Sequence, residues 1–569
     1  MLRKTILILF LFAEIIFSQN LDSLYKEFIL RNSIPNIETQ FQISESENNK
    51  CGFSLAASIR THLNEFTSDQ LQKIEEIFAR PEMQKSIVSP SGIFRIHFDT
   101  TGVNKPEYDT LDILNNVRIK LDINESVRRL AIAFDSAYTY EVEILGYIAP
   151  PKDGTFGGDD KYDIYVTSSA GGYGSTNLDD EIGDNKYISY IKIHNTFTGS
   201  FYTKGIEAAR VTAAHEFHHA IQVGNYIYRD SDRFYYELTS TSMEEFVFDH
   251  VNDYYYYMKS YFNKPSRRFT RFDDGNDGYD VALWNIFLKE KFGSETPNTG
   301  DEIIKKSWDL MSEKNQKAIV ALQNSLSHFG FSFSDLFNEF GIWLYFTNNR
   351  TKENKYFEEA SFYPLVKNST EIFLESSKMP IMLSCEPTSL NYLLIKDNSQ
   401  GLPDSIFAIL SNSDVNGTLT TGNNIDIDFT IETSSFDGSF EIGDNYFAKI
   451  VGNNSNYIGH SYIINNELAS NYIERTNVDF VYPQPFRYEE FGNICFPTFA
   501  DESGKSELYI YSADMNLIYN NSLPISVSGK MIVTWNGLDN NMNKLASGVY
   551  IYVTKANDKI KKGKFVILK

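Results

Sequence analysis

Residues 211–222 read Val-Thr-Ala-Ala-His-Glu-Phe-His-His-Ala-Ile-Gln, and the organisation of the whole chain is best understood from this stretch. It contains the pattern His-Glu-x-x-His. On a helix, His215 and His219 lie one turn apart on the same face. Two imidazoles at that spacing can bind one Zn2+, and Glu216 can accept a proton from the water of such a site. Residues 206–214 contain neither Pro nor Gly, so the sequence predicts a helix that carries a metal site.

A chance match on a buried helix is the alternative interpretation of this motif. The chain has 9 His in 569 residues, so composition alone gives such a match a probability on the order of one per cent. Apolar neighbours such as Phe217 and Ile221 indicate that the helix is buried, and Gly224 is a candidate for its C-cap. His218 lies about 100° around the helix from His219 and is interpreted as structural.

A catalytic zinc site has three protein ligands and one open position, so a third ligand is expected downstream. Residues 234–248 read as a second helix, on which Glu237 and Glu244 share a face. The segment from Glu237 to Glu244, Glu-Leu-Thr-Ser-Thr-Ser-Met-Glu, resembles the second motif of the gluzincin metallopeptidases. The separation from His219, 237 − 219 = 18, is close to the spacing in that family. The resemblance implies that Glu237 is the third ligand and that Glu244 supports a zinc-binding His. The alternative for Glu237 is a solvated carboxylate near a helix start.

Tyr279 follows a loop rich in Asp and Gly and precedes a predicted helix that ends at Gly293. In aminopeptidase-type gluzincins, a Tyr at the start of such a helix hydrogen-bonds the tetrahedral intermediate, so the resemblance implies this role for Tyr279. A Tyr packed at a helix start is the alternative. The Lys-Gly that follows this Tyr in that family is absent, as is the motif Gly-x-Met-Glu-Asn. These departures favour an endopeptidase or an unusual specificity.

The N-terminal residues predict export. Residues 1–18 have a basic start, a short apolar run and a small residue at Ser18, which is typical of a secretory signal peptide. A membrane anchor is the alternative, but the apolar run is short and Glu14 interrupts it. We find no other long apolar stretch and therefore expect no transmembrane segment after signal cleavage. The formal net charge of −23 argues against nucleic-acid binding and fits a secreted protein.

Residues 19–90 are predicted to be a helical prosegment or lead-in, and they contain Cys51. A prosegment thiolate could cap the zinc and hold an enzyme latent. A disulfide or an inert thiol is the preferred interpretation of Cys51. Together with Cys385 and Cys495 the chain has 3 Cys, so one stays unpaired in an exported protein, and the sequence does not say which one.

Residues 91–376 are predicted to form the catalytic domain. Strands are expected within 92–102, in the second half of 150–167 and over 187–193, with a helix over 124–143 and further helices from the motif to about residue 373. This order is that of a zincin catalytic domain. The segments 94–102, 157–165 and 215–222 together resemble a family of exported bacterial proteins regarded as metalloproteases and related to the gluzincins.

The loop before the second strand carries four carboxylates that could bind Ca2+. They are Asp153, Asp159, Asp160 and Asp163. Their spacing does not match an EF-hand, and a polar turn is the preferred interpretation.

The rest of the chain alternates in the manner of short strands with tight turns. Residues 377–480 predict a β-sandwich domain and residues 481–569 an Ig-like domain. The strings Tyr-Pro-x-Pro-Phe at 482–486 and Gly-Lys-Phe-Val-Ile-Leu-Lys at 563–569 are similar to the C-terminal sorting domain of the type IX secretion system. That resemblance implies passage through the periplasm and outer membrane to the medium or cell surface, with the type IX secretion machinery as partner. A plain Ig-like binding module is the alternative.

The sequence therefore predicts a multidomain protein, with an α+β zincin-like (gluzincin) catalytic domain followed by two β-sandwich or Ig-like domains. The predicted function is that of a secreted zinc-dependent peptidase acting on proteins or peptides. The competing class is a catalytically idle surface binding protein on a metalloprotease scaffold. The intact set of His215, Glu216 and His219 favours the peptidase.

Overall fold

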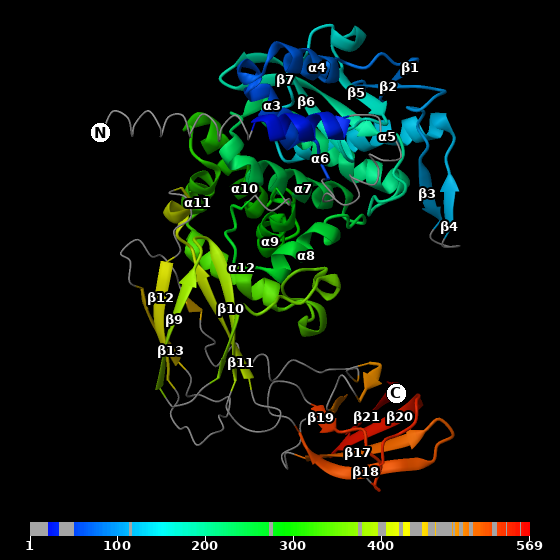
Figure 1. Cartoon of the computed structure of the whole chain (residues 1–569), viewed down its shortest axis with the longest axis vertical. Helices are drawn as coiled ribbons and strands as arrows, with labels where there is room; N and C mark the ends of the chain where they lie inside the picture. The colour runs from blue at the N-terminus through cyan, green and yellow to red at the C-terminus, as the bar shows by residue number, and fades with distance from the viewer. Residues whose placement is uncertain are drawn as a thin grey trace. The chain divides into compact units, whose positions relative to one another are not determined.

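The computed structural model of the chain (Figure 1) forms two compact units, Met1–Asn263 with Phe269–Phe333, and Lys264–Arg268 with Ser334–Lys569. Residues 1–20, which carry the predicted signal peptide, lie outside the described part of the chain. The described residues are 21–32, 50–112, 117–271, 277–373, 378–396, 405–419, 425–432, 447–452, 461–462, 481, 484–488, 493–499, 505–525, 532–541, 543–557 and 559–568.

A five-stranded sheet lies at the centre of the first unit, in the order β1-β2-β5-β7-β6. Its strands are β1 Lys85–Val88, β2 Phe94–Phe98, β5 Tyr162–Thr167, β6 Gly174–Gly183 and β7 Lys186–His194. The inner strands β2, β5 and β7 are parallel, whereas the edge strands β1 and β6 are antiparallel to their neighbours. A separate hairpin consists of β3 Asp109–Asp112 and β4 Val117–Lys120. Within the described part of the chain, β7 is the only named strand that pairs with the edge strand β6.

The strands predicted within 92–102, 150–167 and 187–193 are confirmed as β2, β5 and β7. Buried and half-buried side chains alternate along β2, as its pattern predicts. Strand β6 has no such signal, because its sequence Gly-Ser-Thr-Asn-Leu-Asp-Asp-Glu-Ile-Gly does not alternate and its first five residues are all buried.

The first unit also contains the following helices. They are a helix over 21–32, α3 Phe53–Thr61, α4 Ser68–Phe78, α5 Ile123–Tyr138, α6 Gly205–Asn225, α7 Arg233–Phe248, α8 Tyr255–Asn263, α9 Leu283–Lys291, α10 Thr299–Glu313 and α11 Ala318–His328. The shorter helical turns are η1 Leu63–Glu65, the π-helical η2 Thr139–Ile144, η3 Phe156–Gly158, η4 Asp230–Asp232 and η5 Tyr279–Val281.

Helices α5 and α6 cover one face of the sheet. The ring of Phe94 on β2 contacts Phe134 of α5 and Phe217 of α6, with centroid separations of 5.4 Å in both pairs. Helix α4 covers the other face, where the hydroxyl of Tyr190 donates to the carbonyl oxygen of Phe78 at 2.7 Å. Helix α6, which carries the motif, is therefore a core element with almost all of its residues buried.

Gly224 is not the C-cap that the sequence suggests. Helix α6 continues to Asn225, so Gly224 lies inside its last turn. A Cβ atom at Gly224 would lie 2.2 Å from Cδ of Pro151. The glycine is needed there because the loop at Pro151 packs directly against the helix backbone.

The second unit contains one long helix and several sheets. Helix α12 spans Phe333–Tyr345, and it is followed by the turns η6 Asn348–Arg350 and η7 Ala360–Phe362 and the short helix α13 Val415–Leu419. Its strands are β8 Thr370–Phe373, β9 Lys378–Cys385, β10 Ser389–Lys396, β11 Ser405–Asn412, β12 Ile425–Glu432, β13 Phe447–Gly452, β14 Ser461–Tyr462, β15 Phe486–Arg487, β16 Ile494–Pro497, β17 Lys505–Ser512, β18 Leu517–Pro524, β19 Ile532–Trp535, β20 Gly548–Ala556 and β21 Lys559–Leu568.

The sheets of this unit are β14-β11-β10-β8, β13-β12-β9, β15-β21-β20-β17-β18 and β16-β19. The expectation of helices to about residue 373 is wrong, because β8 forms a strand that pairs in parallel with β10. The chain is thus a mixed α/β protein with several sheets. The zincin and Ig-like assignments and the domain boundaries stay predictions.

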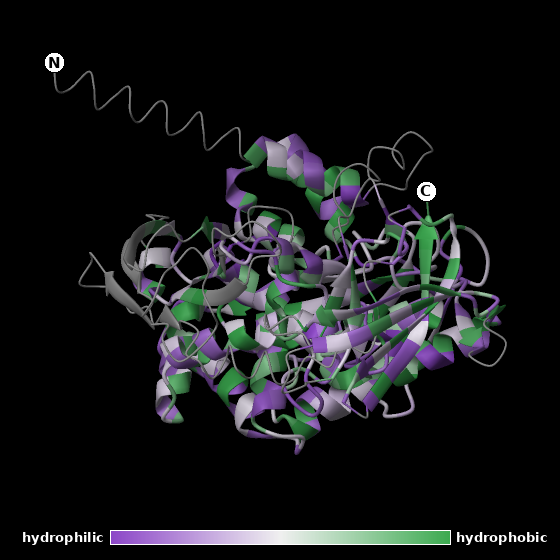
Figure 2. Ribbon diagram, turned by 90° about the horizontal axis from the view of Figure 1, so that it is seen from below, coloured by the Kyte–Doolittle hydropathy of each residue, from purple (hydrophilic) through white to green (hydrophobic). Residues whose placement is uncertain are grey.

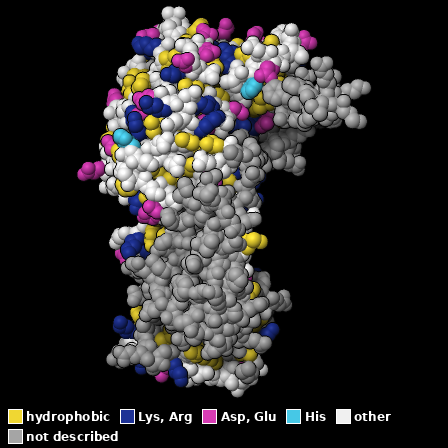
Figure 3. Space-filling model, turned by 90° about the vertical axis from the view of Figure 1, so that its left-hand side faces the viewer, with side chains coloured by type: hydrophobic (Ala, Val, Ile, Leu, Met, Phe, Trp, Pro, Cys, Tyr) yellow, Lys and Arg dark blue, Asp and Glu magenta, His cyan; other side chains and the backbone are white. Residues whose placement is uncertain are grey.

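Polar and apolar residues are distributed as expected for packed elements. Figure 2 shows hydrophobic and hydrophilic residues interspersed along many of the helices and strands. On the face shown in Figure 3, basic and acidic side chains are intermixed over the upper part of the molecule. That face offers no extended area of one charge sign in the described residues.

Candidate metal centre

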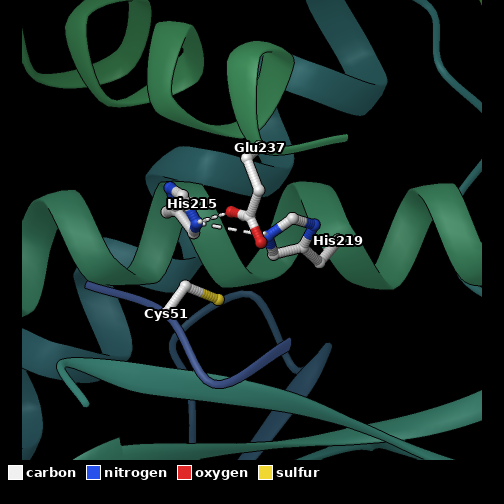
Figure 4. Close-up of side chains that lie close together, drawn as sticks. All are labelled: Cys51, His215, His219 and Glu237. Atoms are coloured by element: carbon white, nitrogen blue, oxygen red, sulfur yellow. Dashed lines mark hydrogen bonds and ion pairs between the residues drawn. The ribbon is translucent and has the colours of Figure 1, made fainter. Parts of the chain in front are cut away.

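Helices α6 and α7 bring three donor atoms to one point. His215 and His219 project from successive turns of α6, and their Nε2 atoms lie 3.1 Å apart. Glu237 of α7 faces them, with its Oε2 at 3.2 Å from each Nε2 (Figure 4). All three side chains are buried. The structure thus brings together the three residues that the sequence proposes as ligands.

The other ring nitrogen of each imidazole is held by an acceptor. His215 Nδ1 lies 2.7 Å from Oε1 of Glu244, and His219 Nδ1 lies 2.7 Å from Oε1 of Gln222. An acceptor at Nδ1 keeps the ring proton there, which leaves the lone pair on Nε2. Both lone pairs are therefore directed at the shared point beside Glu237.

Cys51 completes a group of four possible ligands. Its Sγ lies with one donor atom each of His215, His219 and Glu237 in a set whose members are all within 4.8 Å of one another, and all four residues are buried. In the part of the chain that the structure describes, this is the one group of three or more His, Cys, Asp or Glu side chains suited to hold a metal ion.

The distances and the donor types fit a zinc ion. A tetrahedral Zn2+ with bonds of about 2.0–2.1 Å to nitrogen and oxygen holds those ligand atoms about 3.3 Å apart. The three contacts among His215, His219 and Glu237 are 3.1 to 3.2 Å. Imidazole, carboxylate and thiolate are also the ligand types that zinc takes in proteins. The residues present therefore fit Zn2+.

Glu216 lies beside this group without belonging to it. Its Oε2 accepts a hydrogen bond from the hydroxyl of Thr176 at 2.9 Å, and its Oε1 accepts from the thiol of Cys51 at 3.1 Å. A Cβ atom at Gly174 would lie 2.9 Å from Cγ of Glu216, so the glycine lets strand β6 approach the carboxylate closely. The Glu216 carboxylate is thus fixed facing the position that the sulfur occupies.

The titratable groups of the site shift one another's pKa values. Burial lowers the pKa of His215, but hydrogen bonds to Glu237 and Glu244 outweigh it and raise the pKa to about 9. Burial raises the pKa of Glu237, whereas His219 and His215 bring it well below its ordinary value. Burial and the nearby Glu216 and Glu237 raise the pKa of the Cys51 thiol. A divalent cation favours thiolate and neutral imidazole, and so it would reverse the shifts of Cys51 and His215.

A buried lysine neutralises the acids behind His215. Lys50 Nζ lies 2.5 Å from Oε2 of Glu244 and 2.5 Å from Oδ2 of Asp253. Tyr173 donates its hydroxyl proton to Asp253 at 3.2 Å. This network lies directly behind an imidazole of the group and is fully enclosed.

Tyr279 and His218 are placed in different environments. The Tyr279 hydroxyl accepts a hydrogen bond from the backbone N–H of Cys51 at 3.3 Å, so it borders the site, and the side chain is buried. His218 points away from the group and pairs with Glu141 of η2, with 2.8 Å between Nδ1 and Oε2. The interpretation of His218 as a structural residue agrees with this placement.

The four loop carboxylates do not converge on one point. Each of them pairs with a Lys or Arg side chain: Asp153 with Arg80, Asp159 with Arg95 and Lys161, Asp160 with Lys152, and Asp163 with Arg80. Asp163 also lies 2.7 Å from Nε2 of His97. These pairs account for the carboxylates and give no support to Ca2+ in this loop.

The structure corrects the interpretation of the cysteines. None of Cys51, Cys385 and Cys495 is in a disulfide. The interpretation of Cys51 as a disulfide partner is therefore wrong, and its sulfur lies in a group of possible metal ligands. Its distance in sequence from the motif, 165 residues to Glu216, is why the pattern alone did not place it there.

Several residues of the centre were missed in the sequence. Gln222 lies three positions after His219 on the same helix, and this spacing was a usable signal. Ser54, which donates to Oε1 of Glu237 at 2.5 Å, and Thr176 have no local signal. Lys50 and Asp253 are equally unmarked, because Lys50 lies 194 residues before Glu244 and 203 residues before Asp253.

Comparisons with known proteins add little to this description. No protein-family model matches the chain, and no curated protein matches it. Among solved structures, PorZ is similar to part of the chain; it is described as an essential bacterial surface component of the type-IX secretion system of Porphyromonas gingivalis. The identity is 16%, the match covers 32% of this chain and 23% of that chain, and the TM-score is 0.14. The chain thus spans less than a quarter of PorZ, and so low a TM-score does not indicate a shared overall fold.

None of the described helices is both long and apolar enough to cross a membrane.

Proposed function

We propose that the chain is a zinc-dependent peptidase, with His215, His219 and Glu237 as the metal ligands. One observation carries the proposal. The two Nε2 atoms and a carboxylate oxygen converge within 3.2 Å of one another, while each Nδ1 is occupied by its own acceptor. An arrangement of this kind is typical of zinc centres, because the acceptors orient the imidazoles toward the ion.

Glu216 is the proposed general base. A Zn2+ ion held there would polarise the carbonyl of a peptide bond and make water a stronger nucleophile near neutral pH. The Glu216 carboxylate faces the fourth position of the group, at 3.1 Å from the sulfur that lies there, and Thr176 orients it. It accepts the proton of the attacking water and passes it to the leaving amine.

Strand β6 and Tyr279 border the place where a substrate would lie. The edge of β6 can hydrogen-bond the backbone of an extended peptide, as sheet edges do in peptide recognition. The Tyr279 hydroxyl contacts the N–H of Cys51, which pairs with this edge, and it can donate to a developing oxyanion. Proteins and peptides are therefore the proposed substrates.

The architecture around the motif supports this reading. A sheet with three parallel inner strands and two antiparallel edge strands packs against the motif helix, and a second helix supplies the acidic ligand. This arrangement agrees with a zincin-like domain of gluzincin type. The supporting role of Glu244 toward His215 Nδ1 agrees with the same family pattern.

Export is proposed on sequence grounds. The signal peptide at residues 1–18 and the sorting-like strings in residues 481–569 support passage to the medium or the cell surface. The type IX secretion machinery is the proposed partner for that passage.

Metal analysis of two variants tests the proposal. The purified parent protein should carry about one Zn2+ per chain. Glu237→Ala should lose the metal, whereas Glu216→Gln should keep it and the fold. Casein hydrolysis is compared after proteolytic activation of each protein. Glu216→Gln should then hydrolyse casein at least a hundredfold more slowly than the parent. Tyr279→Phe should lose a smaller factor of activity, mainly in kcat.

Two results would count against this assignment. Full zinc retention by Glu237→Ala, with loss in Glu244→Ala, would refute the choice of ligand. A processed parent that binds zinc and cleaves no peptide would favour the catalytically idle surface binding protein.

A further inference from the structure

Residues 50–52 run along the free edge of β6. The N–H of Gly52 donates to the carbonyl oxygen of Gly174 at 2.9 Å, and the N–H of Tyr173 donates to the carbonyl oxygen of Lys50 at 2.8 Å. Cys51 and Gly174 form a parallel β-bridge. This short segment therefore uses the backbone groups with which a bound peptide would pair.

The side chain of Cys51 enters the candidate metal centre from this added strand. Its sulfur belongs to the group of four donor atoms within 4.8 Å, and it lies 3.1 Å from Glu216 (Figure 4). A catalytic zinc keeps one position for water, whereas four protein ligands close the site. The sulfur thus stands where the attacking water has to be.

The residues on both sides of Cys51 fill the rest of the site. The ring of Phe53 stacks on the imidazole of His219, with a centroid separation of 3.9 Å and an interplanar angle of 18°. Ser54 donates to Glu237, the third member of the ligand set. On the other side, Lys50 is buried between Glu244 and Asp253. Helix α3 continues the segment, and seven of its residues, Phe53 to Ile59, are buried.

We propose that residues 50–59 are an inhibitory segment of the chain itself, with the Cys51 thiolate as a fourth metal ligand and the backbone of residues 50–52 in the place of a peptide substrate. The proposal rests on the proposed peptidase function, because it assigns a regulation to that same site. The unprocessed chain is then latent, and it becomes active when the segment leaves β6.

A permanently closed structural zinc site is the competing account. It explains the four ligands but assigns no function to the Glu216 carboxylate. Thr176 fixes this carboxylate, which is directed at the sulfur. It also gives no reason for a strand-like pairing of residues 50–52 with an edge strand. The inhibitory segment accounts for both features.

Cobalt substitution tests the ligand assignment without any activity measurement. Full-length parent, Cys51→Ser and Cys385→Ser are loaded with Co2+ in place of zinc. Cys385 is a matched control, because it is also buried and outside any disulfide but lies in the second unit. The parent and Cys385→Ser should show a thiolate-to-Co2+ charge-transfer band in the near ultraviolet, and Cys51→Ser should lose it. A Co2+-loaded parent without the band overturns the ligand assignment.

Peptide hydrolysis by the uncut chain tests latency. Cys51→Ser should raise the rate at least tenfold over the parent, and Cys385→Ser should leave it unchanged. Lys50→Met leaves Glu244 and Asp253 without their counter-charge, so it should loosen the segment and raise the rate as well. Lys192→Met is its control, because Lys192 is another buried lysine of the same unit and donates to the carbonyl of Ile77 on the opposite side of the sheet.

Proteolytic cleavage of the exposed loop at Glu82 distinguishes the hypothesis of latency from the hypothesis of peptidase function. A recognition sequence for a site-specific protease is inserted there, between α4 and β1. Equal hydrolysis before and after the cut, with Cys51→Ser no faster than the parent, overturns latency but leaves the peptidase function standing. If neither the cut parent nor Cys51→Ser hydrolyses peptides, while the Co2+-loaded parent shows the band, the peptidase function is overturned but Cys51 remains a ligand.

Discussion

Glu141 and His218 form a neutral pair inside the first unit. Both side chains are fully buried, and burial raises the pKa of Glu141 well above 4.5 and lowers the pKa of His218 well below 6.5. Among the residues that the structure describes, Oε1 of Glu141 and Nε2 of His218 find no hydrogen-bond partner. The pair is therefore stable only while the carboxyl keeps its proton and the imidazole stays uncharged.

Glu141→Gln should remove one pH dependence of folding. The folded chain holds the Glu141 proton to higher pH than the unfolded chain, so this group's contribution is lost as pH rises from about 4.5 through the folded pKa. Between about pH 4.5 and the folded pKa of Glu141, the free energy of unfolding of the variant should rise relative to that of the parent by up to about 1.4 kcal/mol per pH unit. Urea unfolding of both metal-free proteins between pH 5 and about 8 measures the difference. The exposed Glu143→Gln should track the parent, and a pH-independent difference for Glu141→Gln would contradict the neutral pair.

The sequence predicts the candidate site as far as helical spacing reaches. His215, Glu216 and His219 lie on one helix, and Glu237 and Glu244 on the next, so a periodicity of 3.6 is enough to place each set on one face. Cys51 meets this group only through the pairing of residues 50–52 with β6, which no local pattern encodes.

At the scale of elements, helix α5 and the inner strands of the sheet were predictable from the sequence, whereas the edge strand β6 was not. Helix α5 has an apolar stripe and an N-cap at Asp122, whose side chain accepts from the N–H of Glu125 at 2.9 Å. Strand β6 exists because β7 pairs with it and because buried elements cover both of its faces near Gly174, not because of its own alternation. Tertiary packing decides such a strand.

Arg80 ties the segment after α4 to the sheet. Its guanidinium forms ion pairs with Asp153, Asp163 and Asp179 at 2.6, 2.5 and 2.6 Å, and it lies over the ring of Tyr190. Asp163 is fully buried. These contacts raise the pKa of Arg80 and hold three acids of different strands and loops together.

Arg80→Met should destabilise the first unit by about 3–5 kcal/mol, because it leaves buried carboxylates without a counter-charge. Arg128→Met is the matched control. Arg128 pairs with Glu125 on an exposed helix face, where solvent screens the pair, so its loss should change stability little. Denaturant unfolding followed by fluorescence gives both values. A loss for Arg80→Met no larger than for Arg128→Met would show that His97 and the other neighbours suffice to balance Asp163.

At the scale of the whole molecule, the C-terminal residues have a core of their own. Fourteen buried side chains between Val481 and Ile567, including Phe496, Trp535 and Phe565, form one hydrophobic cluster. Every residue of the candidate metal centre lies in the first unit. The site and this cluster therefore share no residues, and either can be altered without removing a part of the other.

Deletion of residues 482–569 should abolish export but leave zinc binding and peptide hydrolysis intact. Because the site contains none of these residues, the truncated protein should bind zinc as the parent does and, after the same processing, hydrolyse peptides at a similar rate. Because the sorting-like strings lie in the deleted part, it should accumulate in the periplasm. Fractionation of cells, with immunodetection and zinc analysis of each fraction, gives both answers. Full-length Glu216→Gln is the reciprocal control: it should leave the periplasm like the parent and be inactive outside. If the truncated protein instead reaches the medium at the parent's level, residues 482–569 are a binding module and not a sorting signal.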